Sequence, residues 1–215
     1  MMMRVRYITT IGLLLLITSC ISEQSVTNKY YVISMLNEQG EIETKGFETI
    51  PGSCEIGQVE INPVYESNQI VNRSDSHEIS YYKYHHWAVR PSVVIVDLIQ
   101  NYLESEDIFQ SVSTRLSRAI PDYRFATRIN HIEVIEDNDA FSAHISIEFR
   151  IIDNSTNRVL IKHDADRTRT LSSKDLNMFA RAVSGILLSE LKAFTIMIEE
   201  QRSVFEREGE RVIEY

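Results

Sequence analysis

The sequence has 215 residues, of which 43% are hydrophobic and 25% are charged, and it contains 7 Gly, 4 Pro and 2 Cys. This composition excludes collagen-like, disordered and disulfide-scaffold proteins, and the length fits one domain. The formal net charge is −9 and no stretch is rich in Lys and Arg, so we expect no nucleic-acid partner.

Residues 1–19 have the layout of a secretory signal peptide. Arg4 and Arg6 supply a positive start, and residues 11–17 are almost purely aliphatic. This apolar run is too short to cross a bilayer, which requires roughly 20 apolar residues. We therefore exclude residues 1–19 from the fold.

The end of this leader, residues 17–20 with the sequence ITSC, resembles the lipobox of bacterial lipoproteins. The resemblance implies cleavage before Cys20 and lipidation of that residue. The alternative is an ordinary signal peptide with an incidental cysteine. Lipid on Cys20 would hold the protein on a membrane, with residues 20–28 as a polar tether. Ile21 replaces the Asp that favours inner-membrane retention, so we expect the periplasmic face of the outer membrane.

The first half of the mature chain alternates between predicted strands and loops. Tyr30–Met35 is rich in β-forming residues and predicts a strand, whereas residues 37–53 contain Gly and Pro and predict a loop or a ragged hairpin. Cys54–Ile61 alternates apolar and polar residues, as a second strand does. We expect Ile70–Val71 to pair with Ile79–Tyr82 in a hairpin.

A helix and a three-strand meander follow. Pro91 occupies a favoured first-turn position, and apolar residues recur at helical spacing up to the polar residues 104–107. Residues 108–112 predict a short helical or irregular element. Three alternating segments joined by turn-forming residues predict the meander: Tyr123–Ile135, Phe141–Ile152 and Val159–Arg169.

The longest apolar stripe at helical spacing runs from Leu176 to Ile198 and predicts the second helix. Ser172 with Asp175 resembles a capping box, in which a serine oxygen accepts hydrogen bonds from free N–H groups of the first turn. Residues 201–215 are charged, and we expect them to form a tail outside the core.

Runs of strands with two amphipathic helices predict an α+β fold. We expect a single domain over residues 29–200, built as a sandwich of a mainly antiparallel sheet with the two helices. The helices would cover one face of the sheet and leave the other face partly wet.

The sequence lacks the usual motifs of catalysis, such as a Gly-rich phosphate loop, a nucleophile elbow or a zinc-protease helix. His85 and His86 are adjacent in a predicted strand and point to opposite faces, so they cannot easily share one ion with His77. We therefore expect no catalytic residues, no metal site and no cofactor. Cys54 has no cysteine partner once Cys20 is lipidated, and we expect a buried or free thiol.

Short motifs occur along the chain in a fixed order. They are the lipobox at Cys20, Tyr30–Tyr31, Gly57–Pro63, Gln69–Arg73, His77–Ile79 and His86–Ala88 before the first long helix. Together they resemble the family of ABC-type transport auxiliary lipoproteins (PqiC-like). The chain departs from the family pattern at Tyr65–Asn68, where Leu-x-Arg-Pro is common, and at Asp75, where Gly is common.

The resemblance implies an accessory and docking lipoprotein of a PqiABC-like intermembrane lipid transport system. Its partners would be a periplasmic mammalian-cell-entry-domain protein and an inner-membrane permease. Association of the chain with copies of itself is a further alternative. One alternative is an outer-membrane assembly or structural lipoprotein without a transport role. A lipid-tethered periplasmic hydrolase is the third alternative, and the family brings no catalytic residues that would support it.

We predict that a partner binds the segment from Gln69 to Trp87, because tyrosine, tryptophan and arginine dominate interface energetics. The predicted partner-binding residues are Gln69, Arg73, Tyr82, Tyr84 and Trp87. Strand alternation separates Tyr82 and Tyr84 from Tyr81, so at least one tyrosine should stay exposed. Arg73 could bind a carboxylate of the partner through two hydrogen bonds. The alternative for Trp87 is a residue of the core.

Overall fold

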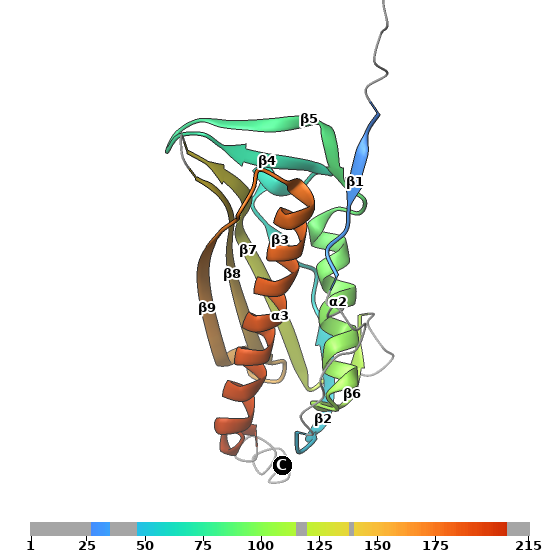
Figure 1. Ribbon diagram of the computed structural model, residues 1–215. Helices are drawn as coiled ribbons and strands as arrows, with labels where there is room; N and C mark the ends of the chain where they lie inside the picture. The colour runs from blue at the N-terminus through green and yellow to red at the C-terminus, as the bar shows by residue number, and fades with distance from the viewer. Residues whose placement is uncertain (1–26, 35–46, 115–119, 138–139, 206–215) are drawn as a thin grey trace, which may run out of the picture.

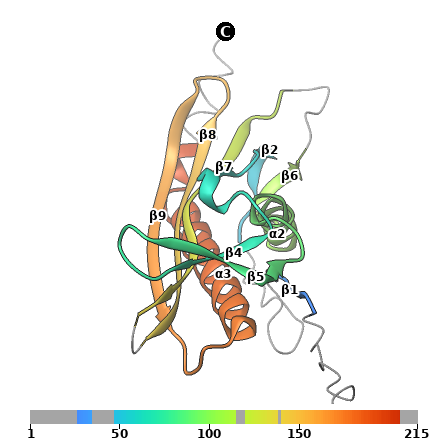
Figure 2. The ribbon, with the colours of Figure 1, turned by 90° about the horizontal axis from the view of Figure 1, so that it is seen from above.

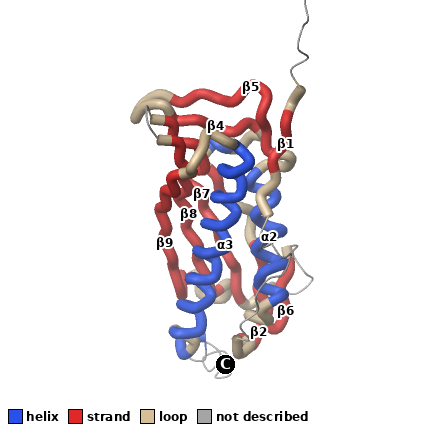
Figure 3. The backbone as a smooth tube through the Cα atoms, viewed as in Figure 1, coloured by secondary structure: helices blue, strands red, loops and turns tan. Residues whose placement is uncertain are grey.

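In the part of the chain that the computed structural model describes, nine strands form one curled sheet, and two long helices lie along its concave side (Figure 1; Figure 3). The structure describes residues 27–34, 47–114, 120–137 and 140–205. In chain order the elements are β1 (Lys29–Tyr31), β2 (Ile50–Ile56), β3 (Glu60–Ile61), the 3-10 helix η1 (Pro63–Tyr65), β4 (Gln69–Arg73), β5 (Ile79–Trp87), α2 (Pro91–Ser105), β6 (Phe109–Ser113), β7 (Tyr123–Glu136), β8 (Phe141–Asp153), β9 (Arg158–Thr170) and α3 (Leu176–Glu200). The α+β class is confirmed. None of the described helices combines the length and the hydropathy that a membrane span requires.

Strand β7 organises the sheet because it is paired along both edges (Figure 2). Along one edge, β8 runs antiparallel to β7 over its full length. Along the other edge β2, β3 and β4 follow one another, each parallel to β7. The chain from Ile50 to Arg73 therefore runs alongside β7 as three short strands. As a result, the β4–β5 hairpin lies at the end of β7 near Glu133.

The predicted meander is confirmed, since β7, β8 and β9 are consecutive antiparallel strands. These strands and the β4–β5 hairpin make up the antiparallel part of the sheet, which includes its two longest ladders. Among the described residues, five shorter pairings are parallel: β1 with β5, β2 with β6, and β7 with β2, β3 and β4. Local alternation does not predict parallel pairings, because they join segments that are far apart in the chain.

Three local predictions are wrong. β2 begins at Ile50, inside the expected loop, and β6 is a strand where a helical or irregular element was expected. The predicted strand Cys54–Ile61 is divided into β2 and β3. The break lies at Gly57, whose N–H donates to the carbonyl of Phe125 at 2.9 Å. A Cβ at residue 57 would lie 3.3 Å from that oxygen, so the close approach favours glycine.

Two further predictions concern the N-terminal strands. The predicted hairpin is confirmed and is longer than expected, because β4 and β5 extend from Gln69 to Trp87. The first strand is shorter, since β1 ends at Tyr31. Met35, the last residue of the predicted strand, lies outside the described residues, as do Cys20 and the rest of residues 1–26.

Helix α3 packs against β8 and β9 on the concave side of the sheet. Its apolar stripe is buried, as predicted: Leu176, Phe179, Val183, Ile186, Leu187, Leu191, Phe194 and Ile198. The predicted serine cap is wrong, because the helix begins after Asp175. The Asp175 carboxylate accepts a hydrogen bond from the Asn177 N–H at 2.8 Å, while the Ser172 hydroxyl turns toward the sulfur of Met178.

The segment after α3 returns to the core at one residue. Phe205 is buried and packs edge-on against Phe109 and Tyr123, with ring centroids 6.3 and 5.2 Å apart. The expectation that residues 201–215 lie outside the core is therefore wrong at Phe205. Residues 206–215 lie outside the described part of the chain.

Candidate functional site

The β4–β5 hairpin carries the residues predicted to bind a partner. Gln69 is exposed at the start of β4. On β5, 43% of Tyr81 is exposed, whereas Tyr82 and Tyr84 are partly buried. Tyr81 thus confirms the prediction that at least one tyrosine of this segment stays exposed.

Tyr82 lines a pocket of about 310 Å³ between β1, β5 and the start of α3. Its hydroxyl lies 3.5 Å from Glu136, whose other oxygen accepts a hydrogen bond from Lys174 at 2.6 Å. On the opposite wall, the Tyr31 hydroxyl and the His85 Nδ1 are hydrogen-bonded at 2.8 Å. Burial raises the pKa of Tyr82 to about 12, and Glu136 contributes to the shift, so the hydroxyl stays protonated at neutral pH.

Trp87 lies in the core. Only 2% of its surface is exposed, and its ring packs on Phe179 of α3 with centroids 5.5 Å apart. The core interpretation of Trp87 therefore holds, and its ring is not available to a partner. The residue joins the hairpin to the helix layer.

Arg73 is also engaged inside the chain. Its Nε donates to Glu133 at 2.9 Å, one terminal nitrogen donates to the carbonyl of Ser76 at 3.1 Å, and the other donates to the Tyr65 hydroxyl at 3.3 Å. The predicted contact of Arg73 with a partner's carboxylate is corrected, because Glu133 of the same chain supplies the carboxylate. Arg73 fastens the hairpin to β7.

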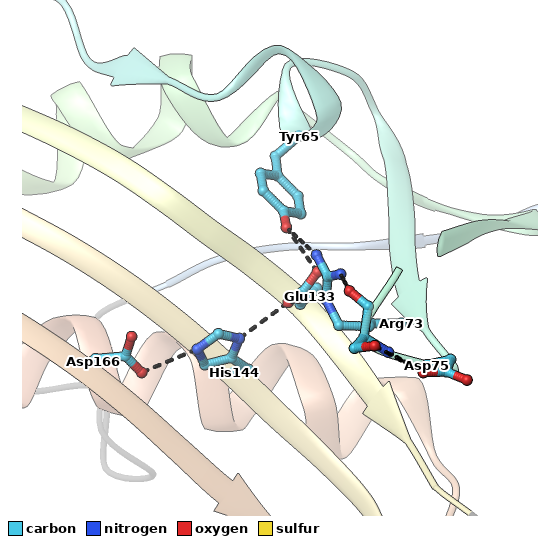
Figure 4. A network of polar contacts seen from close by, with 7 residues as sticks. Tyr65, Arg73, Asp75, Glu133, His144 and Asp166 are labelled. Atoms are coloured by element: carbon cyan, nitrogen blue, oxygen red, sulfur yellow. Dashed lines mark hydrogen bonds and ion pairs between the residues drawn. The ribbon is translucent and has the colours of Figure 1, made fainter. Parts of the chain in front are cut away.

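Glu133 stands at the centre of a polar network (Figure 4). The Tyr65 hydroxyl donates to it at 2.7 Å, and His144 Nδ1 lies 3.1 Å from it on the next strand. Burial opposes the ionisation of Glu133, but the hydrogen bonds from His144, Arg73 and Tyr65 outweigh burial and lower its pKa to about 2. Glu133 is therefore a buried carboxylate that is fully compensated.

A bulge in β7 places this network on the convex face of the sheet, opposite the helices. Register with β8 shifts between Ile129 and His131, so that Asn130 and His131 together face a single residue of β8, Ser146. Strict alternation from Ile129 would turn His131 and Glu133 toward the helices, and the extra residue reverses this. The bulge thus brings His131 and Glu133 to the same face as His144.

The network continues from His144 to the neighbouring strand. His144 Nε2 lies 3.0 Å from the exposed carboxylate of Asp166 on β9, and the hydrogen bond to Glu133 raises the pKa of His144. The ring of His131 stacks on His144 with centroids 5.0 Å apart. Burial lowers the pKa of His131, and its Nδ1 is buried without a hydrogen-bond partner among the described residues.

The histidines singled out in the sequence do not form a group. His85 packs against Tyr31 and His86 against Tyr30, two successive residues of β1 that point to opposite faces. His77 is exposed in the turn of the hairpin. Their separation agrees with the prediction that they do not share an ion.

Cys54 is buried in β2, as expected for a thiol of the core. Burial raises the pKa of this thiol, which suppresses the thiolate and makes the sulfur unreactive.

A second hollow lies at the start of α2. This groove has a volume of about 550 Å³, and apolar side chains of β3, α2 and the segment before β3 line it together with Glu66 and Arg90. Val93 extends from the groove to the surface, where 42% of it is exposed. The groove offers space for an inserted apolar side chain beside polar groups that can orient it.

The network around Glu133 has no motif in the sequence. Its members come from residues 65, 73, 133, 144 and 166, so no local spacing connects them. One signal was present: Asn130 and His131 are two consecutive polar residues between Ile129 and Ile132, a pattern that a bulge in the strand accommodates.

Comparison with known proteins identifies the family. Residues 36–192 match the family model of the ABC-type transport auxiliary lipoprotein component, which covers more than half of the chain. The resemblance found in the sequence motifs is thereby confirmed. No protein of curated function matches the chain.

Solved structures confirm the fold. A Xanthomonas campestris protein of the DUF330 family has a TM-score of 0.67 and 16% sequence identity, and the match covers 85% of this chain and 99% of that protein. A crystal structure of an uncharacterized protein has a TM-score of 0.57 and 14% identity, with 73% and 99% covered. At these identities the likeness establishes a shared fold.

Proposed function

We propose that this chain, which belongs to the family of ABC-type transport auxiliary lipoproteins, docks the periplasmic part of an intermembrane lipid transport system at the outer membrane. Lipid on Cys20 would anchor it to the periplasmic face. Its direct partner would be a mammalian-cell-entry-domain protein, which connects to a permease in the inner membrane. The chain would act by binding, without catalysis of its own.

The observation that carries this proposal is the position of the exposed apolar residues. Large apolar side chains exposed among the described residues are Tyr30, Val32, Tyr81, Val89, Val93, Ile120, Val159 and Ile196. The first five of these eight lie on or beside β1, on β5, in the short segment between β5 and α2, or in the first turn of α2. We call β1, β5 and the first turn of α2 the tether end. An apolar concentration of this kind is typical of a protein-binding surface.

The tether end is also where the chain enters the described fold, following the proposed anchor at Cys20 in the sequence. The chain enters the fold at β1, which pairs with β5, while α2 and α3 finish at the opposite end of the domain (Figure 1). From Cys20 to Lys29 there are nine residue steps (29 − 20 = 9), which reach at most about 32 Å when extended. A partner bound at the tether end would therefore be held close to the membrane.

The groove at the start of α2 supports the same proposal. It opens beside Val93, and Arg90 and Glu66 at its rim form an ion pair at 3.3 Å. An apolar side chain of the partner would enter the groove. Tyr81 and Tyr30 would contact the partner's surface around that side chain. Aromatic residues at the centre of an interface supply much of the binding energy.

A pull-down of the co-encoded mammalian-cell-entry-domain protein tests the proposal. The full-length lipoprotein in detergent should retain this protein without added metal or nucleotide. The double variant Tyr30→Ala/Tyr81→Ala should weaken binding at least about tenfold, because loss of two interface aromatics commonly costs more than 2 kcal/mol. Its melting temperature should change little, since both side chains are exposed.

The matched control is Val159→Ala/Ile196→Ala, which removes two exposed apolar side chains at 44% and 40% exposure, away from the tether end. This control should bind like the wild type. Failure of the folded wild-type protein to bind would contradict the proposal and favour an outer-membrane assembly or structural lipoprotein.

A further inference from the structure

Three potential metal ligands meet on the convex face of the sheet, on three adjacent strands. His131 on β7, His144 on β8 and Asp166 on β9 each offer one donor atom, and the three donor atoms lie within 4.8 Å of one another. Two imidazoles and one carboxylate form a ligand set that suits Zn²⁺ and related transition metals, whereas Ca²⁺ and Mg²⁺ prefer oxygen ligands alone.

The strand register explains how these side chains meet. Ser146 of β8 is paired with His131 on one side and with Asp166 on the other. Its side chain is small, so the longer side chains on either side can converge above it. His144 lies two residues before Ser146, on the same face and diagonal to both neighbours, within reach of long side chains.

Distances within the group are close to those of a coordination sphere. Zinc bonds of about 2.0–2.1 Å in tetrahedral geometry place the ligand atoms about 3.3 Å apart. His144 Nε2 and the Asp166 carboxylate are already 3.0 Å apart. His131 stacks on His144, and its Nδ1 is buried without a partner among the described residues. The three donor atoms lie within 4.8 Å of one another, so they need to approach by at most about 1.5 Å to reach tetrahedral spacing.

A supporting carboxylate orients the central ligand. Metal-binding histidines usually donate their second ring N–H to a carboxylate or a carbonyl. Glu133 lies 3.1 Å from His144 Nδ1, opposite the nitrogen that faces Asp166 (Figure 4). Arg73 and Tyr65 hold Glu133 in turn, so that the His144 ring is fixed before any ion binds.

We propose that His131, His144 and Asp166 form a binding site for a divalent transition-metal ion of the Zn²⁺ class, with Glu133 orienting His144. Binding of the ion releases the proton between His144 Nε2 and Asp166 to solvent, and a water molecule completes the coordination of the ion. Asp166 is exposed, so the ion enters directly from solvent. The site links β7, β8 and β9, and it does not depend on the transport function proposed above.

Zinc titration of the metal-stripped full-length protein, purified in detergent without a histidine tag, tests this site. Isothermal titration calorimetry with ZnCl₂ should give saturable binding of one ion per chain. Asp166→Asn should weaken this binding at least about tenfold, because it removes the anionic ligand from an exposed position where the fold tolerates substitution. At the same Zn²⁺ concentration, the melting temperature of the wild type should rise more than that of Asp166→Asn.

Two controls separate the site from non-specific binding. Asp164→Asn changes an acidic residue two positions away on the same strand, with a similar exposed side chain (64% against 70%), and it should bind Zn²⁺ like the wild type. His86→Ala should also leave binding unchanged, whereas His131→Ala should weaken it at least about tenfold. No saturable Zn²⁺ binding by the folded wild type, or equal affinity of Asp166→Asn and Asp164→Asn, would overturn the proposal.

Discussion

Glu190 and Glu133 are buried on opposite faces of the same sheet, and each contacts one arginine and one histidine. On the helix side, Glu190 of α3 binds Arg167 at 2.6 Å and His163 at 2.8 Å, both from β9. The His163 ring is stacked against Phe149 and Phe194 of the core. This cluster attaches α3 to the edge strand of the meander.

On the convex side, Glu133 binds partners from three different elements: Tyr65 from η1, Arg73 from β4 and His144 from β8. This cluster attaches the hairpin to the sheet. It also remains open, since His144 continues to the exposed Asp166 on β9.

The difference shows that the same types of side chain, one glutamate with an arginine and a histidine, serve two purposes. A carboxylate whose histidine is stacked against aromatic rings of the core works as a clamp between two elements. A carboxylate whose histidine keeps its second nitrogen near solvent holds a donor atom in place for an ion. The position of the cluster relative to the helices decides between these outcomes, because the helices cover one face of the sheet.

The largest expected effect comes from removing the arginine of the more deeply buried pair. Arg73→Ala leaves the Glu133 charge buried without its guanidinium and should lower the free energy of unfolding by about 3–5 kcal/mol. Arg167→Ala should cost only about 1–2 kcal/mol, because the Arg167 side chain is 53% exposed while that of Arg73 is 25% exposed. Urea unfolding of the two variants measures both values. Equal losses of unfolding free energy in the two variants would show that the two clusters contribute equally to stability.

The second effect is a pH dependence. The pKa of Glu133 falls from 4.5 to about 2 on folding. The ionised carboxylate therefore stabilises the folded state above pH 4.5, and this stabilisation is lost as the pH falls toward 2. The raised pKa of His144 acts in the opposite sense: its contribution is present below pH 6.5 and is lost as the pH rises above that value. The network should therefore stabilise most between about pH 4.5 and 6.5.

Glu133→Gln tests this window. The difference in unfolding free energy between wild type and variant should be about 3 kcal/mol near pH 6 and should shrink as the pH falls below 4.5. Glu190→Gln should show a change of the same sign, because the hydrogen bonds from Arg167 and His163 outweigh burial and lower the pKa of Glu190. A difference that does not depend on pH would contradict the charge compensation assigned to Glu133.

Much of the helix-side face follows from the sequence, and little of the convex site does. The stripe from Leu176 to Ile198 and the alternation of β8 are local patterns, which each segment displays by itself. The convex network depends instead on the bulge at Asn130 and on the parallel run of β4 beside β7. Both are tertiary features, and Arg73 and Glu133 are separated by 60 residues.

The smallest effect is expected at the open end of the convex cluster. Asp166→Asn, measured without metal, should change the free energy of unfolding by less than about 1 kcal/mol, because an exposed ion pair contributes little. A loss comparable to that of Arg73→Ala would mean that Asp166 is part of a structural clamp.

Photo-crosslinking in cells tests the central claim, that the tether end binds the transport partner, most directly. A photoreactive phenylalanine analogue in place of Tyr81 should crosslink the lipoprotein to the co-encoded mammalian-cell-entry-domain protein, identified by mass spectrometry. The same analogue in place of Val159, a similarly exposed residue on β9 (44% against 43%), should give no such product. Crosslinking to that protein from position 159 and not from position 81 would contradict the account.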